Sequence, residues 1–417
     1  MNVMRLTSLL DLLYRRRQVS VAIALAVATL AHLAATSLYS WHFVTAGSKA
    51  LWSSDGLHLY ALSPDLQMGP LTFAVGGLFS VFLPGPLGAT AAIIAMLAVG
   101  FIAICTTVRR IPMASARHQR GWMGAAILTA FVWTEVAVHY AHLDDVLALG
   151  AGVLAIASAR NGRLVAAAIC IGVAIDFKPW TLPLVALLCV DRRRLARGAM
   201  LVAAVVLGAW LPFFLADPAT ANILGFVIPI APTSSLRVFG VHATTTPAWD
   251  RVVQLGGASA LVLLAVLRRR WEAVLLLLVA FRMLLDPAAY LYYDSGLVLG
   301  TLFFDTGRAA RASRAVLPIT TIVAVIGITA NDYLLAAPVA GLFRTGALVA
   351  ILAIALVTTA SRNSVAAQGC QSRSTNGRRE SQPASEGGPA LGAIGSALLF
   401  GVSAPEDRGV VAQGSPV

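Results

Sequence analysis

The sequence contains few charged residues. Asp, Glu, Lys and Arg make up 12% of its 417 residues and hydrophobic residues make up 58%, and the mean hydropathy is +0.79. A soluble domain carries about a quarter charged residues, so this composition excludes an ordinary soluble protein and indicates an integral membrane protein. The net charge of +12 comes from arginines in short clusters between apolar runs. Such clusters argue against a nucleic-acid-binding face and favour topology signals.

Cysteine is also scarce. Cys105, Cys170 and Cys189 fall within apolar runs, and Cys370 lies in a polar tail. This spacing matches neither a disulfide framework nor a thiolate metal site, so we predict no structural metal and no disulfide. The chain also shows no internal repeat, and an inverted-repeat transporter therefore gains no support.

The arginine clusters predict the topology, because positive residues favour the cytoplasmic side of a membrane. They indicate an all-α, polytopic transmembrane protein with about twelve spans and both termini in the cytoplasm. The segment 70–83 is too short to cross the bilayer and predicts a re-entrant or surface helix. Between Arg163 and Asp191 we expect two short helices joined near Lys178, because Pro179 follows it and interrupts a helix.

The chain divides into three parts by composition. Residues 1–18 form a basic cytoplasmic N-terminus, and residues 19–360 form the transmembrane domain. Residues 361–417 are rich in Ser, Gly, Arg, Gln and Pro, which cannot bury enough apolar surface to fold, so we expect a disordered cytoplasmic tail. The outer loops of the domain are expected at 40–69, 139–145, 216–250 and 286–294.

The expected outer loops carry the polar residues, whereas the inner loops are short and basic. We therefore expect any chemistry on the extracytoplasmic face. The first loop holds His42, Tyr60, Asp65 and Gln67, a mixture suited to binding a polar substrate. A carboxylate there could act as a general base toward an acceptor hydroxyl, and Asp65, in a constrained setting, is a better candidate than Asp55. The alternative is an ordinary loop with interfacial aromatic residues.

The second outer loop places histidines and acids at the end of a helix. His142, Asp144 and Asp145 together exceed what a helix cap needs, although one of the acids could cap the next span. The group could orient a sugar or accept a proton, so both acids are candidate catalytic residues. A divalent ion is a weaker interpretation, because the spacing fixes no ligand geometry.

Two basic residues lie within apolar segments, where an ionisable side chain is costly and a functional role is the default hypothesis. Lys178 could bind a phosphate, or it could pair locally with Asp176. Arg282 and Asp286 have the i,i+4 spacing that lets them pair on a helix, and Arg282 could also share phosphate binding with Lys178. Two further candidates for substrate binding are Tyr293 and His242.

Four segments carry a resemblance to a known family. They are LHLYALSPDLQMGPLTF from Leu57, HLDDVLALGAG from His142, AIDFKPWTLPLVALL from Ala174 followed by DRRR, and RMLLDPAAYLYYD from Arg282. In order and topology they resemble the GT-C superfamily of membrane glycosyltransferases, in particular the actinobacterial polyprenol-phosphate-mannose-dependent alpha-mannosyltransferases. The resemblance covers most of residues 20–330.

The resemblance implies a GT-C-like fold and an inverting transfer of a hexose, in the first place mannose. The donor would be a polyprenyl-phosphate sugar rather than a nucleotide sugar, and it would be a substrate rather than a cofactor. The acceptor would be a glycolipid or glycan of the cell envelope. The enzyme would lie in the plasma membrane with its active face outside.

The chain departs from this family at one position. Family members place an aspartate immediately after the first span, whereas this chain has SWHF from Ser40. His42, Asp65 and the pair Asp144 and Asp145 are therefore alternative bases. A transporter or flippase of lipid-linked sugar, an inactive lipid-sugar-binding protein and a structural membrane subunit are the other hypotheses.

Overall fold

The computed structural model describes residues 16–33, 38–83, 85–109, 116–312 and 316–360. All of them belong to the first of the two units into which the chain divides, Met1–Ser361. The expected tail 361–417 lies outside the described residues, and so does most of the expected N-terminal segment. The described backbone consists of helices and connections, with one isolated antiparallel bridge between Pro229 and Thr245.

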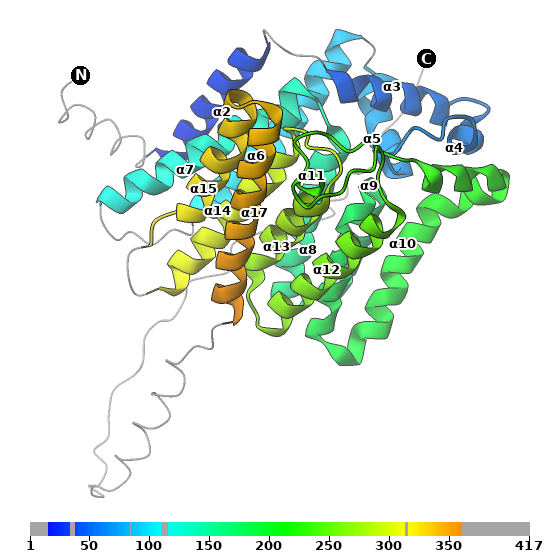
Figure 1. Cartoon of the computed structure of the whole chain (residues 1–417). Helices are drawn as coiled ribbons and strands as arrows, with labels where there is room; N and C mark the ends of the chain where they lie inside the picture. The colour runs from blue at the N-terminus through cyan, green and yellow to red at the C-terminus, as the bar shows by residue number, and fades with distance from the viewer. Residues whose placement is uncertain (1–15, 34–37, 84, 110–115, 313–315, 361–417) are drawn as a thin grey trace, which may run out of the picture. The chain divides into compact units, whose positions relative to one another are not determined.

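The helices follow one another in chain order from blue to orange in Figure 1. The first half contains α2 (Arg17–Leu33), α3 (Tyr39–Leu51), η1 (Gly56–His58), α4 (Leu59–Leu62), α5 (Pro70–Ser80), α6 (Pro86–Val108), α7 (Ala116–Thr134), η2 (Glu135–His139), α8 (Leu143–Arg160), α9 (Leu164–Phe177), η3 (Pro179–Val190) and η4 (Arg192–Arg194). The second half contains α10 (Leu195–Ala216), η5 (Pro218–Gly225), α11 (Ser235–Val238), α12 (Ala248–Leu267), α13 (Trp271–Leu285), α14 (Tyr293–Arg311), α15 (Ile319–Ala324), η6 (Val325–Ala330), α16 (Asn331–Leu334) and α17 (Ala337–Ala360).

Five helical stretches within the described residues are long and apolar enough to cross a membrane. They are Pro86–Val108, Gln119–His139, Arg192–Ala216, Ala248–Leu267 and Ala337–Thr359. The same part of the chain contains five shorter apolar helices of 10–17 residues, which can span only if the bilayer thins around them. The all-helical class is confirmed, and the apolar helices indicate a membrane protein. The count of twelve spans and the GT-C-like arrangement stay predictions.

Helices α10 and α13 differ sharply in their surroundings. Only 11% of the apolar window that contains α10 is covered by the rest of the protein, and Met200, Leu207 and Leu215 are exposed. An apolar surface of this length is unfavourable in water, so lipid is its natural neighbour. In α13, every residue from Ala273 to Ala280 is buried, as expected for a helix that is apolar all round.

The short hairpin predicted after Arg163 is present. Helix α9 has 14 residues and η3 has 12, and the chain is extended at Lys178 between them. Pro179 begins η3, because proline fits the first turn of a helix but interrupts a continuous one. Both elements pack against α8 and α10. The hairpin therefore carries Lys178 at its tip, inside the bundle.

The first polar segment is not the open loop that the sequence predicts, because residues 40–51 belong to α3 and two further short helices follow. Trp41 and Val44 are buried on one face of α3, whereas His42 and Lys49 are exposed on the other. This alternation has the 3.6-residue period of an amphipathic helix. The polar composition of the segment obscures that period, and the prediction of a loop here is wrong.

The helix predicted at 70–83 is present as α5, and its start is fixed against the end of α9. The Leu71 N–H donates a hydrogen bond to Asp176 Oδ2 at 2.8 Å. A Cβ atom on Gly69 would lie 1.5 Å from the Asp176 carbonyl oxygen, so the close approach of the two backbones requires glycine. With 11 residues, α5 is too short to cross a bilayer. Its re-entrant or surface placement stays a prediction.

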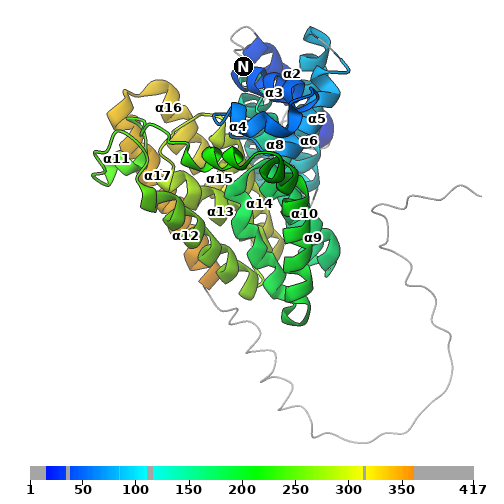
Figure 2. The same cartoon turned by 90° about the vertical axis from the view of Figure 1, so that its right-hand side faces the viewer.

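Two views at right angles show how the connections are distributed. In both, α3, α4 and α11 lie at one end of the long helices, and the turn before α10 lies at the other end (Figures 1 and 2). The turn before α10 carries the basic residues Arg192–Arg194. The polar and aromatic connections are therefore separated from this basic turn along the length of the bundle.

Candidate functional site

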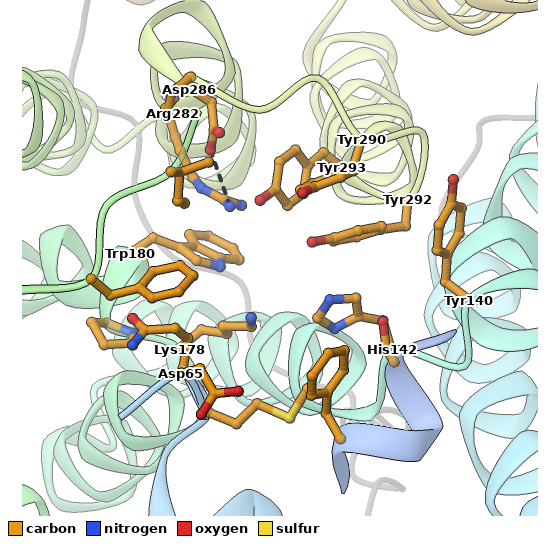
Figure 3. A pocket seen from close by; sticks show the side chains of 18 of the residues that line it. Asp65, Tyr140, His142, Lys178, Trp180, Arg282, Asp286, Tyr290, Tyr292 and Tyr293 are labelled. Atoms are coloured by element: carbon orange, nitrogen blue, oxygen red, sulfur yellow. Dashed lines mark ion pairs between the residues drawn. The ribbon is translucent and has the colours of Figure 1, made fainter. Parts of the chain in front are cut away.

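A pocket of about 330 Å³ is lined by residues from all four segments that the sequence assigns to outer loops. The chain contributes Asp65 from the first, His142 from the second, Phe226 from the third and Tyr290 from the fourth. In Figure 3, side chains from several helices point into one common space. Seven of the predicted site residues line it: Asp65, Gln67, His142, Lys178, Arg282, Asp286 and Tyr293.

An acid cluster at the pocket wall consists of His142 and Lys178, which line the pocket, and of Asp144 and Asp145, which lie behind them. Both acids are in the first turn of α8, where the helix dipole favours negative charge. The cap residue itself is His142, so neither acid caps the helix as predicted. Lys178 Nζ lies 2.6 Å from Asp144 Oδ2 and 3.8 Å from Asp145 Oδ2. The predicted local pair of Lys178 with Asp176 is wrong, because Asp176 faces the start of α5 instead.

The carboxylates of the acid cluster have partners within the protein. His142 Nδ1 hydrogen-bonds to Asp144 Oδ1, and Trp180 Nε1 donates to Asp145 Oδ1 at 3.1 Å. Burial raises the pKa of Asp144, but the charges of His142 and Lys178 outweigh it and hold that pKa below its ordinary value. Burial lowers the pKa of Lys178, but the neighbouring carboxylates raise it above its ordinary value. Each group of this pair therefore favours the charged form of the other.

Arg282 forms a second ion pair at the pocket wall. Its Nη2 lies 3.2 Å from Asp286 Oδ2, which confirms the predicted i,i+4 pair. Its guanidinium carbon lies 4.8 Å from the ring centroid of Trp180 and 4.1 Å from that of Tyr293. The cation is thus held between two aromatic faces. A guanidinium has five N–H donors, and the pair with Asp286 uses only part of them.

Aromatic rings cover much of the remaining wall. Tyr290 and Tyr292 are stacked, with ring centroids 5.4 Å apart and planes at 12°. The ring of Tyr292 also contacts those of His142, at 4.1 Å, and Tyr140, at 5.2 Å. Figure 3 shows these rings across the pocket from Lys178 and Asp65. Flat rings combined with a few polar groups are typical of sites that bind small polar molecules.

Two charged side chains that line the pocket have no hydrogen bond or ion pair with other described residues. They are Asp65, in the connection before α5, and Arg251, in the first turn of α12. Both side chains are exposed. A carboxylate and a guanidinium are therefore available to a ligand in the same pocket.

The other candidate bases do not line this pocket. Asp144 and Asp145 are 0% and 4% exposed, and their oxygens face Lys178, His142 and Trp180. His42 lies on the exposed face of α3 and lines a separate hollow. Among the four candidates, Asp65 alone combines a free carboxylate with a place in the pocket lining.

Two predicted substrate contacts lie elsewhere. Tyr60 is fully buried, and its hydroxyl donates to the Met68 carbonyl at 2.8 Å. Its ring packs against Trp210, with centroids 4.8 Å apart. Tyr60 therefore stabilises the connection before α5, which contains the pocket residues Asp65 to Met68. His242 is exposed and lies outside the lining. Neither residue is positioned to contact a ligand in the pocket.

Two groups of side chains in the described residues bring possible metal-ligating atoms close together. In each group, three donor atoms lie within 4.8 Å of one another: His142, Asp144 and Asp145 in the first, and His32, Glu135 and His139 in the second. In the first group, the ammonium of Lys178 already lies against Asp144. An added cation would have to compete with it. The absence of a structural metal stays a prediction.

Several residues of the pocket lining were not among the predicted site residues, and Arg251, Trp180 and Tyr292 are three of them. Trp180 follows Lys178 and Pro179 in one of the resembling segments, but an interfacial tryptophan is commonplace in membrane proteins. Arg251 directly follows the expected outer loop 216–250, in the first turn of α12, and it belongs to no arginine cluster. An isolated arginine at an expected outer boundary is the feature that could have identified it.

Comparisons of the chain with protein-family models, with curated proteins and with solved structures find no match. The resemblance to membrane glycosyltransferases therefore rests on the four sequence segments. All four segments contribute residues to the pocket, through Asp65, His142, Lys178 and Arg282 among others, and the geometry of that pocket carries the functional interpretation.

Proposed function

We propose that the protein is a membrane glycosyltransferase. It transfers a hexose, in the first place mannose, from a polyprenyl-phosphate donor to a hydroxyl group of a glycolipid or glycan acceptor at the outer membrane face. The observation that supports this function best is the presence of a free carboxylate, free and paired cations and aromatic faces in one pocket. Asp65, Arg251 and Trp180 exemplify the three.

The donor phosphate would be bound by cations of the pocket. Arg251 has a free guanidinium, and Lys178 and Arg282 line the same space with donors beyond those used in their ion pairs. Arginine matches phosphate oxygens through two parallel N–H bonds. A positively charged wall also stabilises the negative charge that develops on the leaving phosphate. The cations would therefore act on binding and on the transition state.

The hexose would lie against the aromatic wall. The Trp180 ring and the stacked rings of Tyr290 and Tyr292 offer flat faces to the apolar side of a sugar. Gln67 adds an amide, which is partly used by the Pro64 carbonyl at 2.9 Å. Such a combination orients a polar ring without requiring a metal or a cofactor.

Asp65 would act as the general base in a single displacement. Its carboxylate takes the proton from the acceptor hydroxyl, and the acceptor oxygen attacks the anomeric carbon. The bond between that carbon and the phosphate oxygen breaks, and the polyprenyl phosphate leaves with the bonding electron pair. One displacement inverts the configuration at the anomeric carbon. A positioned base of this type contributes about 10²- to 10⁴-fold in rate.

A transfer assay with the full-length protein in lipid vesicles tests this function. Labelled polyprenyl-phosphate-mannose and a glycolipid acceptor are supplied, and transfer is measured for the wild type, Asp65→Asn and Arg251→Gln. Asp65→Asn should reduce the rate constant of transfer by at least about 10²-fold. Arg251→Gln should mainly raise the donor concentration needed for half-maximal rate, since it removes a phosphate contact.

Matched controls come from exposed residues outside the pocket. Asp55→Asn changes an acid that precedes η1, and Arg268→Gln changes an arginine at the opposite end of α12. Both variants should transfer sugar at the wild-type rate. Unchanged transfer in Asp65→Asn would disprove its role as the base, and absence of transfer in the wild type would disprove the function with these substrates.

Movement of lipid-linked sugar across the membrane is the second candidate function. Asp294 and Arg344 form a buried pair at 3.6 Å between α14 and α17, with exposed fractions of 0% and 1%. Ionisable groups buried among apolar helices often mark transport routes. The same vesicles distinguish the two functions, because a flippase would move labelled donor between leaflets without forming a glycosylated product.

A further inference from the structure

A hollow of about 500 Å³, which we name the basic groove, lies between α9 and α10. Its lining comes from residues 162–169, where α9 begins, and from residues 194–201, where α10 begins. Lys178 follows the other end of α9, about 20 Å away by the rise of a 14-residue helix. None of the described residues lines both the basic groove and the pocket, so the groove is a separate concave surface.

The wall of the basic groove carries charge of one sign. Among the described residues that line it are three exposed arginines, Arg163, Arg194 and Arg197, and no acid. Arg194 Nε lies 3.7 Å from Asp191 Oδ2 outside the lining, and their side chains are 68% and 37% exposed, so this ion pair is weak. The side chains of Arg163 and Arg197 have no hydrogen bond or ion pair within the described part of the chain. Two guanidinium groups are therefore available to an anion.

The turn between α8 and α9 fixes the backbone of Arg163. Gly162 has a φ of 73°, a left-handed conformation that glycine adopts without strain. The Arg163 N–H donates to the Ser158 carbonyl at 2.9 Å, and the Gly162 N–H donates to the Ala159 carbonyl at 3.0 Å. These two bonds are the pattern of a Schellman cap at the end of α8. The turn is thus held by its own hydrogen bonds, and a ligand does not have to order it.

The rest of the groove lining is apolar. Its larger side chains are those of Leu164, Val165, Ile169 and Leu201. Val165 and Ile169 have the i,i+4 spacing of one helix face, and they are 48% and 44% exposed. On α10, Leu201 follows Arg197 by one turn. Each helix therefore presents an arginine near its start and apolar side chains one or two turns farther along, which suits a ligand with a charged end and an apolar body.

The apolar surface continues along α10 beyond the groove. Met200 and Leu207 are 65% and 56% exposed, and both lie about 60–80° from Arg197 around the helix axis, at about 100° per residue. Only 11% of the apolar window that contains α10 is covered by protein, so lipid is its natural neighbour. The arginine and the lipid-facing surface are therefore on the same side of α10. A small soluble anion would leave this apolar path unused.

We propose that the basic groove binds an anionic phospholipid of the surrounding bilayer. The guanidinium groups of Arg163 and Arg197 bind the phosphate oxygens of the headgroup, since arginine matches phosphate through paired N–H donors. The acyl chains lie against the apolar wall and along α10. Basic pockets between membrane helices bind such headgroups in other proteins. An anionic lipid is favoured over a zwitterionic one, because the described lining offers no acid to an ammonium group.

The lipid would connect the starts of α9 and α10. Farther along, the two helices are in direct contact, because a Cβ atom on Gly172 would lie 2.7 Å from Val205 Cβ. At the basic groove the helices leave a space instead, and the headgroup joins them through Arg163 and Arg197. Helix α9 leads to Lys178 at the pocket wall. The lipid thus stabilises the helix that positions this lysine, and its binding does not depend on any transfer reaction.

Native mass spectrometry of the full-length protein in a neutral detergent tests this site. Phosphatidylglycerol and phosphatidylcholine are titrated separately, and the dissociation constant of the first bound lipid is measured. The wild type should bind phosphatidylglycerol at least about tenfold more tightly than phosphatidylcholine. The double variant Arg163→Gln with Arg197→Gln should bind phosphatidylglycerol about 25-fold more weakly than the wild type, because each arginine near an anionic lipid contributes about fivefold.

The control is the double variant Arg268→Gln with Arg269→Gln, which removes the same charge from exposed arginines outside the groove. It should bind phosphatidylglycerol like the wild type. An equal loss in both double variants would overturn the proposal, because the attraction would then be a general effect of charge. Equal binding by the wild type and Arg163→Gln with Arg197→Gln would also overturn it.

Inorganic phosphate distinguishes a lipid site from a site for a soluble phosphate compound. Millimolar phosphate should not displace phosphatidylglycerol from the wild type, and displacement would overturn the proposal. A second measurement needs no variant. Phosphatidylglycerol with a photoreactive group in its acyl chain should crosslink to residues 162–169 or 194–201 of the wild type, and crosslinks confined to other segments would contradict the assignment.

Discussion

The acid cluster and the histidine cluster contain the same kinds of side chain but differ in their charge balance. In the acid cluster, the ammonium of Lys178 lies 2.6 Å from Asp144, so the protein supplies its own cation. In the histidine cluster, which consists of His32, Glu135 and His139, Glu135 Oε1 is bound by His32 and by the hydroxyl of Tyr333. Residue types alone therefore do not decide how a buried carboxylate is compensated. The neighbouring groups decide it.

The largest effect should come from removing the internal cation of the acid cluster. Lys178→Ala leaves Asp144 buried with an uncompensated charge, and breaking a buried pair in this way costs about 3–5 kcal/mol. Thermal unfolding in detergent should show a much lower midpoint. The double variant Lys178→Ala with Asp144→Ala should recover part of the loss. A single variant as stable as the wild type would show that the cluster does not depend on its lysine.

The next effect concerns one hydrogen bond of the histidine cluster, which the hydroxyl of Tyr333 donates. Tyr333→Phe removes the donor to Glu135 Oε1 and leaves the largely exposed ring in place. We expect a loss of about 0.5–1.5 kcal/mol, the usual net value of one hydrogen bond, measured by thermal unfolding. Tyr290→Phe, in a partly exposed tyrosine whose hydroxyl makes no hydrogen bond with the described residues, is the control. Equal stability of the two variants would mean that Glu135 does not need this donor.

The smallest effect should come from a histidine-acid pair at the surface. His58 Nδ1 lies 3.3 Å from Asp217 Oδ2, and both side chains are partly exposed. Exposed pairs of this kind contribute little, so His58→Ala should unfold at the same midpoint as the wild type at neutral pH. A clear loss of stability would contradict the expectation that an exposed pair contributes less than the two buried clusters.

The pH dependence of the same variant follows from Asp217. The Ala219 N–H, and after it His58, lowers the pKa of Asp217 below its ordinary value. A carboxyl group with a lowered pKa contributes stability above its unfolded-state pKa, and that contribution is lost as the pH falls through its folded-state pKa. The hydrogen bond from the Ala219 N–H is the larger cause of the lowered pKa. His58→Ala should therefore still lose most of this stability when the pH falls, as measured by thermal unfolding at several pH values.

Features set by neighbours in the sequence could be predicted. The break at Lys178 follows from Pro179, the pair of Arg282 and Asp286 follows from their i,i+4 spacing, and both are present. The helical class follows from the apolar composition. The number of spans and the outward orientation of the pocket stay predictions, because they depend on the membrane as well as on the chain.

Features set by packing between distant segments could not be predicted. Lys178 has Asp176 as a sequence neighbour, yet it pairs with Asp144 on another helix, because Asp176 is held by the start of α5. The partnership of His32 with Glu135 spans 103 residues, and no local pattern encodes it. The pocket likewise selects Asp65 among four candidate bases through its place in the lining rather than through its local sequence.

The backbone contact at Gly69 restricts how the pocket can change during evolution. A methyl group at this position would meet the Asp176 carbonyl and would separate α5 from α9, and Asp65 and Lys178 lie a few residues from the two contacting positions. A library of variants selected for a larger or smaller acceptor should therefore leave position 69 as glycine in every active clone. Adaptation of the pocket to a new acceptor would have to occur on its other walls, for example along Phe226 to Pro229.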